Sequence, residues 1–223
     1  MVQKRPRPPR LTPSERARVV EIFDRFAHAE PDPRTELHYT SPYTLVVAVA
    51  LSAQATDVSV NKATERLFRR AATPQAMLDL GEAELAREIS SIGLFNTKAR
   101  NVIALSRLIL ERHGGETPLR REDLQALPGV GRKTASVVLN ELGIEPAIAV
   151  DTHVFRVAHR LGLSQGATPD KVEADLMVVV PPERRTRAHH WLILHGRYVC
   201  VARKPRCGAC IVSDLCPSRD LFP

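Results

Sequence analysis

The chain has 223 residues, enough for one large core or two domains at roughly 100–200 residues per domain. Its 32 Lys and Arg against 25 Asp and Glu give a formal net charge of +7, a balance typical of proteins that bind nucleic acids. Aromatic residues are only 4% of the chain, which disfavours a base-stacking platform for single strands, and no apolar run approaches the about 20 residues of a membrane span. We therefore expect a soluble, intracellular and cytoplasmic protein.

The chain begins with a basic, proline-rich segment, residues 1–10, which we predict to be a disordered tail that either contacts phosphates or stays solvated. From Thr12 onward the pattern is helical. Thr12 or Ser14 is expected to cap a first helix, and Ser41 with Pro42 to open a second that is apolar on most sides.

More helices follow, one capped by Asp57 and one opened by Thr73 and Pro74. Residues 147–150 are the only segment that we predict to be extended, and four residues do not make a sheet. Beyond them the pattern predicts helices near 152–161, 169–179 and 184–199. The predicted fold class is therefore all-α.

A glycine-rich turn, LPGVGRKTA, occupies residues 127–135 before an apolar helix. Gly129 and Gly131 allow the backbone of the turn to be exposed, and the helix N-terminus presents N–H groups and the positive end of the helix dipole. Such a turn can bind DNA phosphates without reading sequence. Glycine is also common in ordinary helix–turn–helix connections, but Arg132 and Lys133 favour phosphate binding.

The four cysteines of the chain all lie near its C-terminal end. They are Cys200, Cys207, Cys210 and Cys216. Four thiolates placed together suit a metal or an iron–sulfur cluster. Disulfides are disfavoured because a chain without a signal peptide is expected in the reducing cytoplasm. Structural zinc is a serious alternative, although zinc ribbons usually pair two Cys-x2-Cys knuckles and this chain has one. The loop between the first two cysteines carries Arg203, Lys204 and Arg206, which suggests a polyanion close by.

Several motifs carry a resemblance to a known family. They are LPGVGRKTA, VDTHVFRVAHRLGL at 150–163, the cysteine pattern, LSAQATDVSVNKAT at 51–64, IGLFNTKARN at 92–101 and HHWLILHGRYVC at 189–200. Together they resemble the endonuclease III family of DNA glycosylases, with its helix-hairpin-helix and Gly/Pro...Asp motif, over about residues 36–216.

The resemblance implies an all-α helix-hairpin-helix DNA glycosylase fold of two domains. A six-helix barrel domain with the hairpin would span residues 35–146. An iron–sulfur cluster domain would combine residues 11–34 with 147–223, and its four cysteines would hold a [4Fe-4S] cluster.

The family also implies a bifunctional DNA N-glycosylase and abasic-site lyase of base-excision repair, which removes oxidised pyrimidines from duplex DNA and cleaves by β-elimination. Lys133 matches the amine nucleophile that forms the Schiff base. Burial and the positive end of the helix are both expected to disfavour an ammonium there, and Arg132 to add to the effect, so that the neutral, attacking amine is favoured. Asp151 matches the essential aspartate, which can stabilise oxocarbenium charge and move protons. The plainer alternatives are that Lys133 contacts phosphate and that Asp151 caps a helix.

Extrusion of a base leaves a gap in the duplex, and the resemblance assigns its filling to Gln54 and Leu94, with Leu94 as an apolar wedge. His153 and Gln125 are predicted to face the lesion pocket, and many members of the family carry glutamate at the position of Gln125. The full set of predicted DNA contacts is Gln54, Leu94, Leu127, Gly129, Val130, Gly131, Arg132, Arg203, Lys204 and Arg206.

Three alternatives stay open. An adenine-specific mismatch glycosylase shares the fold and cluster but normally lacks the lysine matched by Lys133. A noncatalytic iron–sulfur DNA-binding module is disfavoured by the combination of Lys133 and Asp151, and an electron-transfer protein is the third. We expect a monomer, associated with the nucleoid, that acts on damaged double-stranded DNA.

Overall fold

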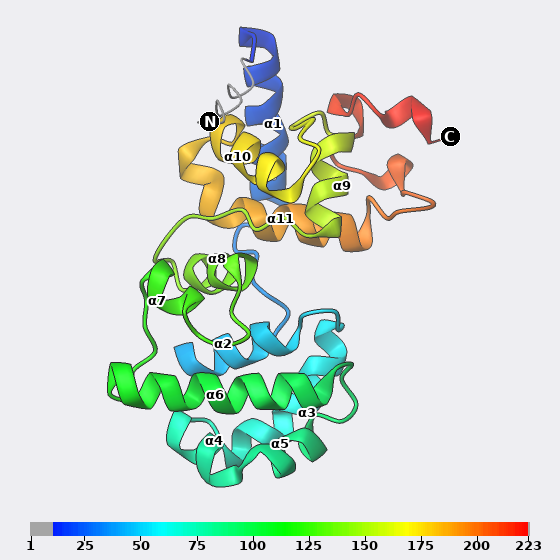
Figure 1. Cartoon of the computed structure of the whole chain (residues 1–223). Coiled ribbons are helices and arrows are strands. Elements are labelled where there is room, and N and C mark those ends of the chain that lie inside the picture. Colours follow the sequence, from blue (N-terminus) through cyan, green and yellow to red (C-terminus); the bar gives the residue numbers. More distant parts are fainter. Residues whose placement is uncertain (1–10, 223) are drawn as a thin grey trace. The chain divides into compact units, whose positions relative to one another are not determined.

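The computed structural model describes residues 11–222, and the predicted basic tail at 1–10 lies outside the described residues. The regular elements of the described part are eleven α-helices and four short 3-10 turns (Figure 1). Residues 147–150, expected to be extended, form no strand. The predicted all-α class is therefore confirmed. The chain divides into two compact units, a middle unit of residues 35–145 and a terminal unit of residues 11–34 and 146–222.

The middle unit contains seven helices. They are α2 (Pro42–Leu51), α3 (Asp57–Arg70), α4 (Pro74–Leu80), α5 (Glu82–Glu88), α6 (Phe95–His113), α7 (Arg121–Gln125) and α8 (Arg132–Glu141). The long helix α6 packs against α2 and against α4 and α5 (Figure 1). Helix α2 is buried at every position from Tyr43 to Leu51, as its apolar sequence predicts, so it forms the centre of this unit's core.

Side-chain caps define where several of these helices begin. Ser41 accepts a hydrogen bond from the amide of Thr44 and forms a capping box with it, as expected for the start of α2. Thr73 caps α4 in the same way. The predicted cap of α3 was wrong, because Thr56 accepts from the Ser59 amide and Asp57 is the first helical residue.

The terminal unit contains four helices and four 3-10 turns. They are α1 (Pro13–Ala29), α9 (Thr152–Arg160), α10 (Pro169–Val179), α11 (Arg185–Tyr198), η1 (Pro182–Arg184), η2 (Cys207–Ala209), η3 (Ser213–Leu215) and η4 (Arg219–Leu221). Thr12 caps α1 and shares a capping box with Glu15, whereas Ser14 lies inside the helix. The helices predicted near 152–161, 169–179 and 184–199 are confirmed to within one residue at each end.

The core of the terminal unit lies between α1 and the helices that follow residue 150. Phe23 and Phe26 of α1 are buried, and Phe23 packs against Trp191 of α11. Helices α9 and α11 approach closely at Gly196, where a Cβ would lie 2.9 Å from the Cβ of His153. This packing fixes the start of α9 and the end of α11, the two places from which the predicted site residues of this unit extend.

Candidate functional site

The glycine-rich turn lies between α7 and α8 and is anchored by buried side chains. Leu127 and Val130 are 2% and 4% exposed, and the Val130 amide donates to the Leu127 carbonyl at 3.0 Å. Gly129 has a φ of 79°, and a Cβ there would lie 3.0 Å from the Cβ of Asn101 on α6. The turn can therefore offer DNA its backbone and its exposed glycines, while its two apolar side chains serve the core.

Helix α8 begins directly after this turn. Gly131 is its N-cap and supplies no side-chain cap hydrogen bond, and Arg132 and Lys133 are its first two residues. Both are exposed, so the expected burial of Lys133 was wrong. Uncapped amides and the positive end of the dipole form the kind of surface that binds a phosphate. Arg121 of α7 holds this arrangement in place by donating to Ser136 of α8 at 2.9 Å.

Asp151 is the N-cap of α9 in the terminal unit. Its Oδ1 accepts from the Val154 amide at 2.8 Å, so the helix-cap alternative is a real role of this residue. The side chain is half-buried, and a carboxylate has a second oxygen that can act in proton transfer. His153, two residues on, is also half-buried, and its Nδ1 lies 3.3 Å from an Nη of Arg156.

Gln54 and Leu94 share an unusual backbone. They are the non-glycine residues with positive φ in the described part of the chain, at 55° and 60°. Both side chains are exposed, and Leu94 remains 63% exposed at the N-cap of α6. The left-handed conformation costs a residue with a Cβ about 1–2 kcal/mol, and such strain concentrates at functional sites. The sequence indicated these two positions but gave no sign of the strain.

Lys98, one turn into α6, is a residue that sequence reasoning missed. It is 7% exposed, and its Nζ has no hydrogen-bond partner in the part of the chain that the structure describes. Burial lowers the pKa of its amine. The sequence signal that could have indicated Lys98 is a lysine close to the N-terminus of a helix, four residues after Leu94, where its positive charge opposes the helix dipole.

The four cysteine sulfurs line one cavity in the terminal unit, together with Arg160, Leu161 and His195. Burial, followed by the charges of the other cysteines, raises the pKa of the Cys210 and Cys216 thiols. Thiolates in this cavity therefore need cationic partners. In the described residues no three His, Cys, Asp or Glu side chains are placed to hold a single metal ion. An all-thiolate donor set that surrounds a shared space fits an iron–sulfur cluster, in which each thiolate binds a different iron.

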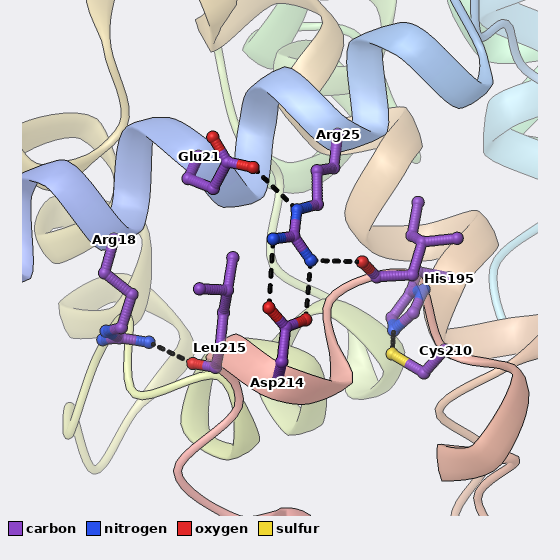
Figure 2. A network of polar contacts seen from close by, with 8 residues as sticks. Arg18, Glu21, Arg25, His195, Cys210, Asp214 and Leu215 are labelled. Carbon is purple, nitrogen blue, oxygen red and sulfur yellow. Dashed lines mark hydrogen bonds and ion pairs between the residues drawn. The ribbon is translucent and has the colours of Figure 1, made fainter.

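Arginines from α1 hold the segment that carries the last two cysteines (Figure 2). Arg25 contacts both carboxylate oxygens of Asp214, at 2.6 and 3.0 Å, and also donates to the Ile211 carbonyl at 3.0 Å. The hydrogen bond from Arg25 lowers the pKa of Asp214. Arg18 donates to the Leu215 carbonyl at 3.0 Å. These contacts join a helix from the start of the chain to the cysteine segment.

Helix α9 holds the first cysteine from another direction. Arg160 lies 3.4 Å from the Cys200 sulfur and donates to the Val201 and Ala202 carbonyls, both at 2.8 Å. Arg156 donates to the Cys200 carbonyl at 3.0 Å. The basic residues of the loop that follows are all exposed. They are Arg203, Lys204 and Arg206.

The predicted site residues thus fall into two groups. The middle unit carries the glycine-rich turn, Lys133, Gln54, Leu94 and the exposed Gln125, and the terminal unit carries Asp151, His153, the cysteines and the basic loop. No helix in the described residues is long and apolar enough to span a bilayer.

Comparison with known proteins identifies the family. Residues 47–182 match the HhH-GPD superfamily of base excision DNA repair proteins, and residues 200–216 match the iron–sulfur binding domain of endonuclease III. Endonuclease III of Haemophilus influenzae is 57% identical and that of Escherichia coli strain K12 is 54% identical, over 90% and 92% of this chain and 95% and 97% of those proteins.

Two solved structures are similar over nearly their whole length. A non-covalent endonuclease III–DNA complex aligns with a TM-score of 0.87, and a trapped covalent endonuclease III–DNA intermediate with 0.86. Both are 41% identical to this chain, cover 95% of it, and are themselves covered to 98% and 99%. The chain therefore belongs to the endonuclease III family of base excision DNA repair proteins, with the helix-hairpin-helix glycosylase fold and a [4Fe-4S] cluster domain.

Proposed function

We propose that this protein is a bifunctional DNA N-glycosylase and abasic-site lyase that removes oxidised pyrimidines from duplex DNA. The observation that carries the proposal is Lys133, an exposed amine in the first turn of a helix that has no side-chain cap and follows a glycine-rich turn. Family membership supports the reaction class. The trapped covalent DNA intermediate of a relative at 41% identity supports an enzyme-bound intermediate in particular.

The proposed chemistry uses Lys133 as nucleophile. Its neutral amine attacks C1′ of the damaged nucleotide, the glycosidic bond breaks, and the base departs with the bonding electrons and takes up a proton. Transfer of an amine proton to the ring oxygen opens the sugar and leaves a protonated Schiff base. Loss of a C2′ proton then breaks the C3′–O bond by β-elimination, and water releases the enzyme. Asp151 is proposed to stabilise the positive charge that develops on the sugar and to carry these protons.

DNA binding is proposed to involve both units. Backbone amides at Gly131 and the start of α8 would hold a phosphate, and Gln54 and Leu94 would fill the gap left by the extruded nucleotide. Arg203, Lys204 and Arg206 would contact the phosphate backbone. The cluster, when bound, supplies cationic iron to the four thiolates and so fixes the loop that carries these basic residues.

We also propose that the two units are the barrel and cluster domains of this enzyme. The divisions at 34/35 and 145/146 lie within one residue of the expected boundaries, which supports this assignment. We propose further that the enzyme acts as a monomer on damaged double-stranded DNA, and that its working location is the nucleoid.

The test is base release from a duplex that contains thymine glycol, by the protein loaded with its cluster. Release of the damaged base with strand cleavage is expected, and alkaline treatment of a parallel sample separates glycosylase from lyase products. A duplex with adenine mispaired with guanine is the control for the other specificity of this fold. Release of adenine but not of the oxidised pyrimidine would overturn the proposed substrate, and binding without release of either base would leave a noncatalytic module.

A further inference from the structure

An open cavity lies between α3 and α5 in the middle unit, away from the glycine-rich turn. Its volume is about 410 Å³, which is ample for a phosphate group with its water molecules, since a water molecule occupies about 30 Å³ of liquid. Its lining is mostly polar and charged. The lining residues are Lys62, Ala63, Arg66, Glu84, Arg87, Glu88 and Ser91.

Ion pairs fix the floor of this cavity. The Glu88 side chain is only 5% exposed and pairs with Arg70 and with the Nε of Arg66, the latter at 3.2 Å. Glu84 pairs with Arg70 at 3.0 Å and with Arg87, and the hydrogen bond from Arg70 lowers the pKa of Glu84. The Glu84 carboxylate therefore stays ionised at neutral pH.

The cavity keeps an excess of positive charge. Its lining carries three cations, Lys62, Arg66 and Arg87, against the two carboxylates of Glu84 and Glu88, which leaves a surplus of one positive charge. Lys62 is exposed and makes no hydrogen bond or ion pair with the described residues. Arg66 is 76% exposed and uses only its Nε edge on Glu88, so its Nη groups remain for another acceptor. A guanidinium held at one edge suits the oxygens of a phosphate.

The cavity also lies beside the residues proposed to enter the duplex. Ser91 lines it three residues before Leu94, and α3 begins at Asp57, three residues after Gln54. At 1.5 Å per residue, Lys62 and Arg66 lie about 8 and about 14 Å beyond Asp57 along the helix. One strand of a duplex carries a phosphate about every 3.4 Å of its axis. Counted from the start of α3, these lengths equal the axial rise of about two to four nucleotides.

We propose that this cavity is a subsite for a backbone phosphate of the DNA that flanks the lesion, bound by Lys62 and Arg66. The proposal rests on the proposed function for the identity of the ligand as DNA. A purely structural ion-pair network would need Arg66, Arg70, Glu84 and Glu88 to join α3 to α5, but it would not need Lys62. Lys62 is therefore the residue that separates the two roles.

The experiment measures the salt dependence of binding to a duplex with a stable abasic analogue. Lys62→Ala and Arg66→Ala are compared with Arg69→Ala, a matched control on the same helix whose arginine is 72% exposed, pairs with Glu65 and does not line the cavity. Loss of one phosphate contact should lower the slope of log affinity against log salt by about 0.9. The advantage of the wild type over Lys62→Ala should then shrink about 3.5-fold between about 50 and about 200 mM salt. A slope for Lys62→Ala equal to that of Arg69→Ala would overturn the proposal.

A second arm identifies the source of the phosphate. Neutral methylphosphonate linkages replace the phosphates about two to four nucleotides from the abasic analogue, a range set by the axial spacing of phosphates. The wild type should bind this duplex more weakly than the unmodified duplex, whereas Lys62→Ala should bind the two duplexes equally. Binding of inorganic phosphate by the wild type, without any effect of the neutral linkages, would show a site for free phosphate and overturn the DNA assignment. If the wild type releases no damaged base, but its salt slope on undamaged duplex still exceeds that of Lys62→Ala, the proposed function fails and the phosphate subsite stands.

Discussion

Two glycines of the turn at residues 127–135 should respond differently to the same substitution. Gly129 has a φ of 79°, and a Cβ there would lie 3.0 Å from the Cβ and 3.1 Å from the Nδ2 of Asn101. Alanine in the left-handed region costs about 1–2 kcal/mol, and Asn101 would have to shift by a few tenths of an ångström as well. Gly129→Ala should therefore lower the free energy of unfolding by about 1–3 kcal/mol.

Gly131 has a φ of −84°, and a Cβ there would meet no atom within 4 Å. Alanine lowers the conformational entropy of the unfolded chain relative to glycine, which stabilises the fold by about 0.4–1 kcal/mol. Alanine is also a poorer N-cap residue than glycine, which offsets this stabilisation. The free energy of unfolding of Gly131→Ala should therefore stay within about 0.5 kcal/mol of the wild-type value. The variant should still bind abasic duplex roughly 10- to 150-fold more weakly, because the added methyl group obstructs one charge-assisted amide–phosphate hydrogen bond worth about 1.5–3 kcal/mol.

Urea unfolding followed by circular dichroism measures the first effect, and fluorescence anisotropy with an abasic analogue measures the second. Both variants must carry the cluster in wild-type amount, as judged by visible absorbance. Equal stability of the two variants would refute the strain argument at Gly129. Wild-type affinity of Gly131→Ala would refute the close approach of phosphate to the start of α8.

Three further predictions concern other residues. Lys98→Met should raise the melting temperature near neutral pH. The pKa of Lys98 is lowered in the folded wild type, so the wild type gains stability as pH rises toward the unfolded lysine pKa of about 10.4, and the advantage of Lys98→Met should shrink over that range. An advantage that does not change with pH would contradict this. Asp214→Asn should speed loss of the cluster absorbance in the presence of an iron chelator. Because the pKa of Asp214 is lowered, the wild type should keep its advantage at any pH above about 3.9 and lose it only in stronger acid. Leu94→Gly should raise the free energy of unfolding by up to about 1 kcal/mol, since relief of about 1–2 kcal/mol of strain exceeds the backbone-entropy cost of glycine. The same variant should bind damaged duplex more weakly. A variant less stable than the wild type would show that Leu94 is not strained.

The helices could be predicted from the sequence because their signals are local. Thr12, Ser41 and Thr73 each precede a proline and accept a hydrogen bond from an amide three residues later, which requires no knowledge of the rest of the fold. The start of α3 was misplaced because Thr56 and Asp57 are both good caps, and the choice between them depends on how the loop after α2 enters the helix.

The strain and burial in the middle unit could not be predicted in the same way. The left-handed backbone of Gln54 and Leu94 is imposed by the loops that join α2 to α3 and α5 to α6, and neither residue type indicates it. Lys98 is buried because α6 packs against α2, α4 and α5, whereas a lysine early in a helix is usually exposed. The cavity that contains Lys62 likewise depends on the approach of α5 to α3.

The central claim is Schiff-base chemistry at Lys133, and borohydride trapping tests it most directly. Cluster-loaded protein is mixed with duplex DNA that carries thymine glycol or an abasic site, and wild type is compared with Lys133→Ala and with Arg69→Ala as a control that keeps the nucleophile. A covalent protein–DNA complex with the wild type and the control, but not with Lys133→Ala, is the predicted result. A complex of wild-type yield with Lys133→Ala, or none with active wild type, would contradict the assignment of Lys133 as nucleophile.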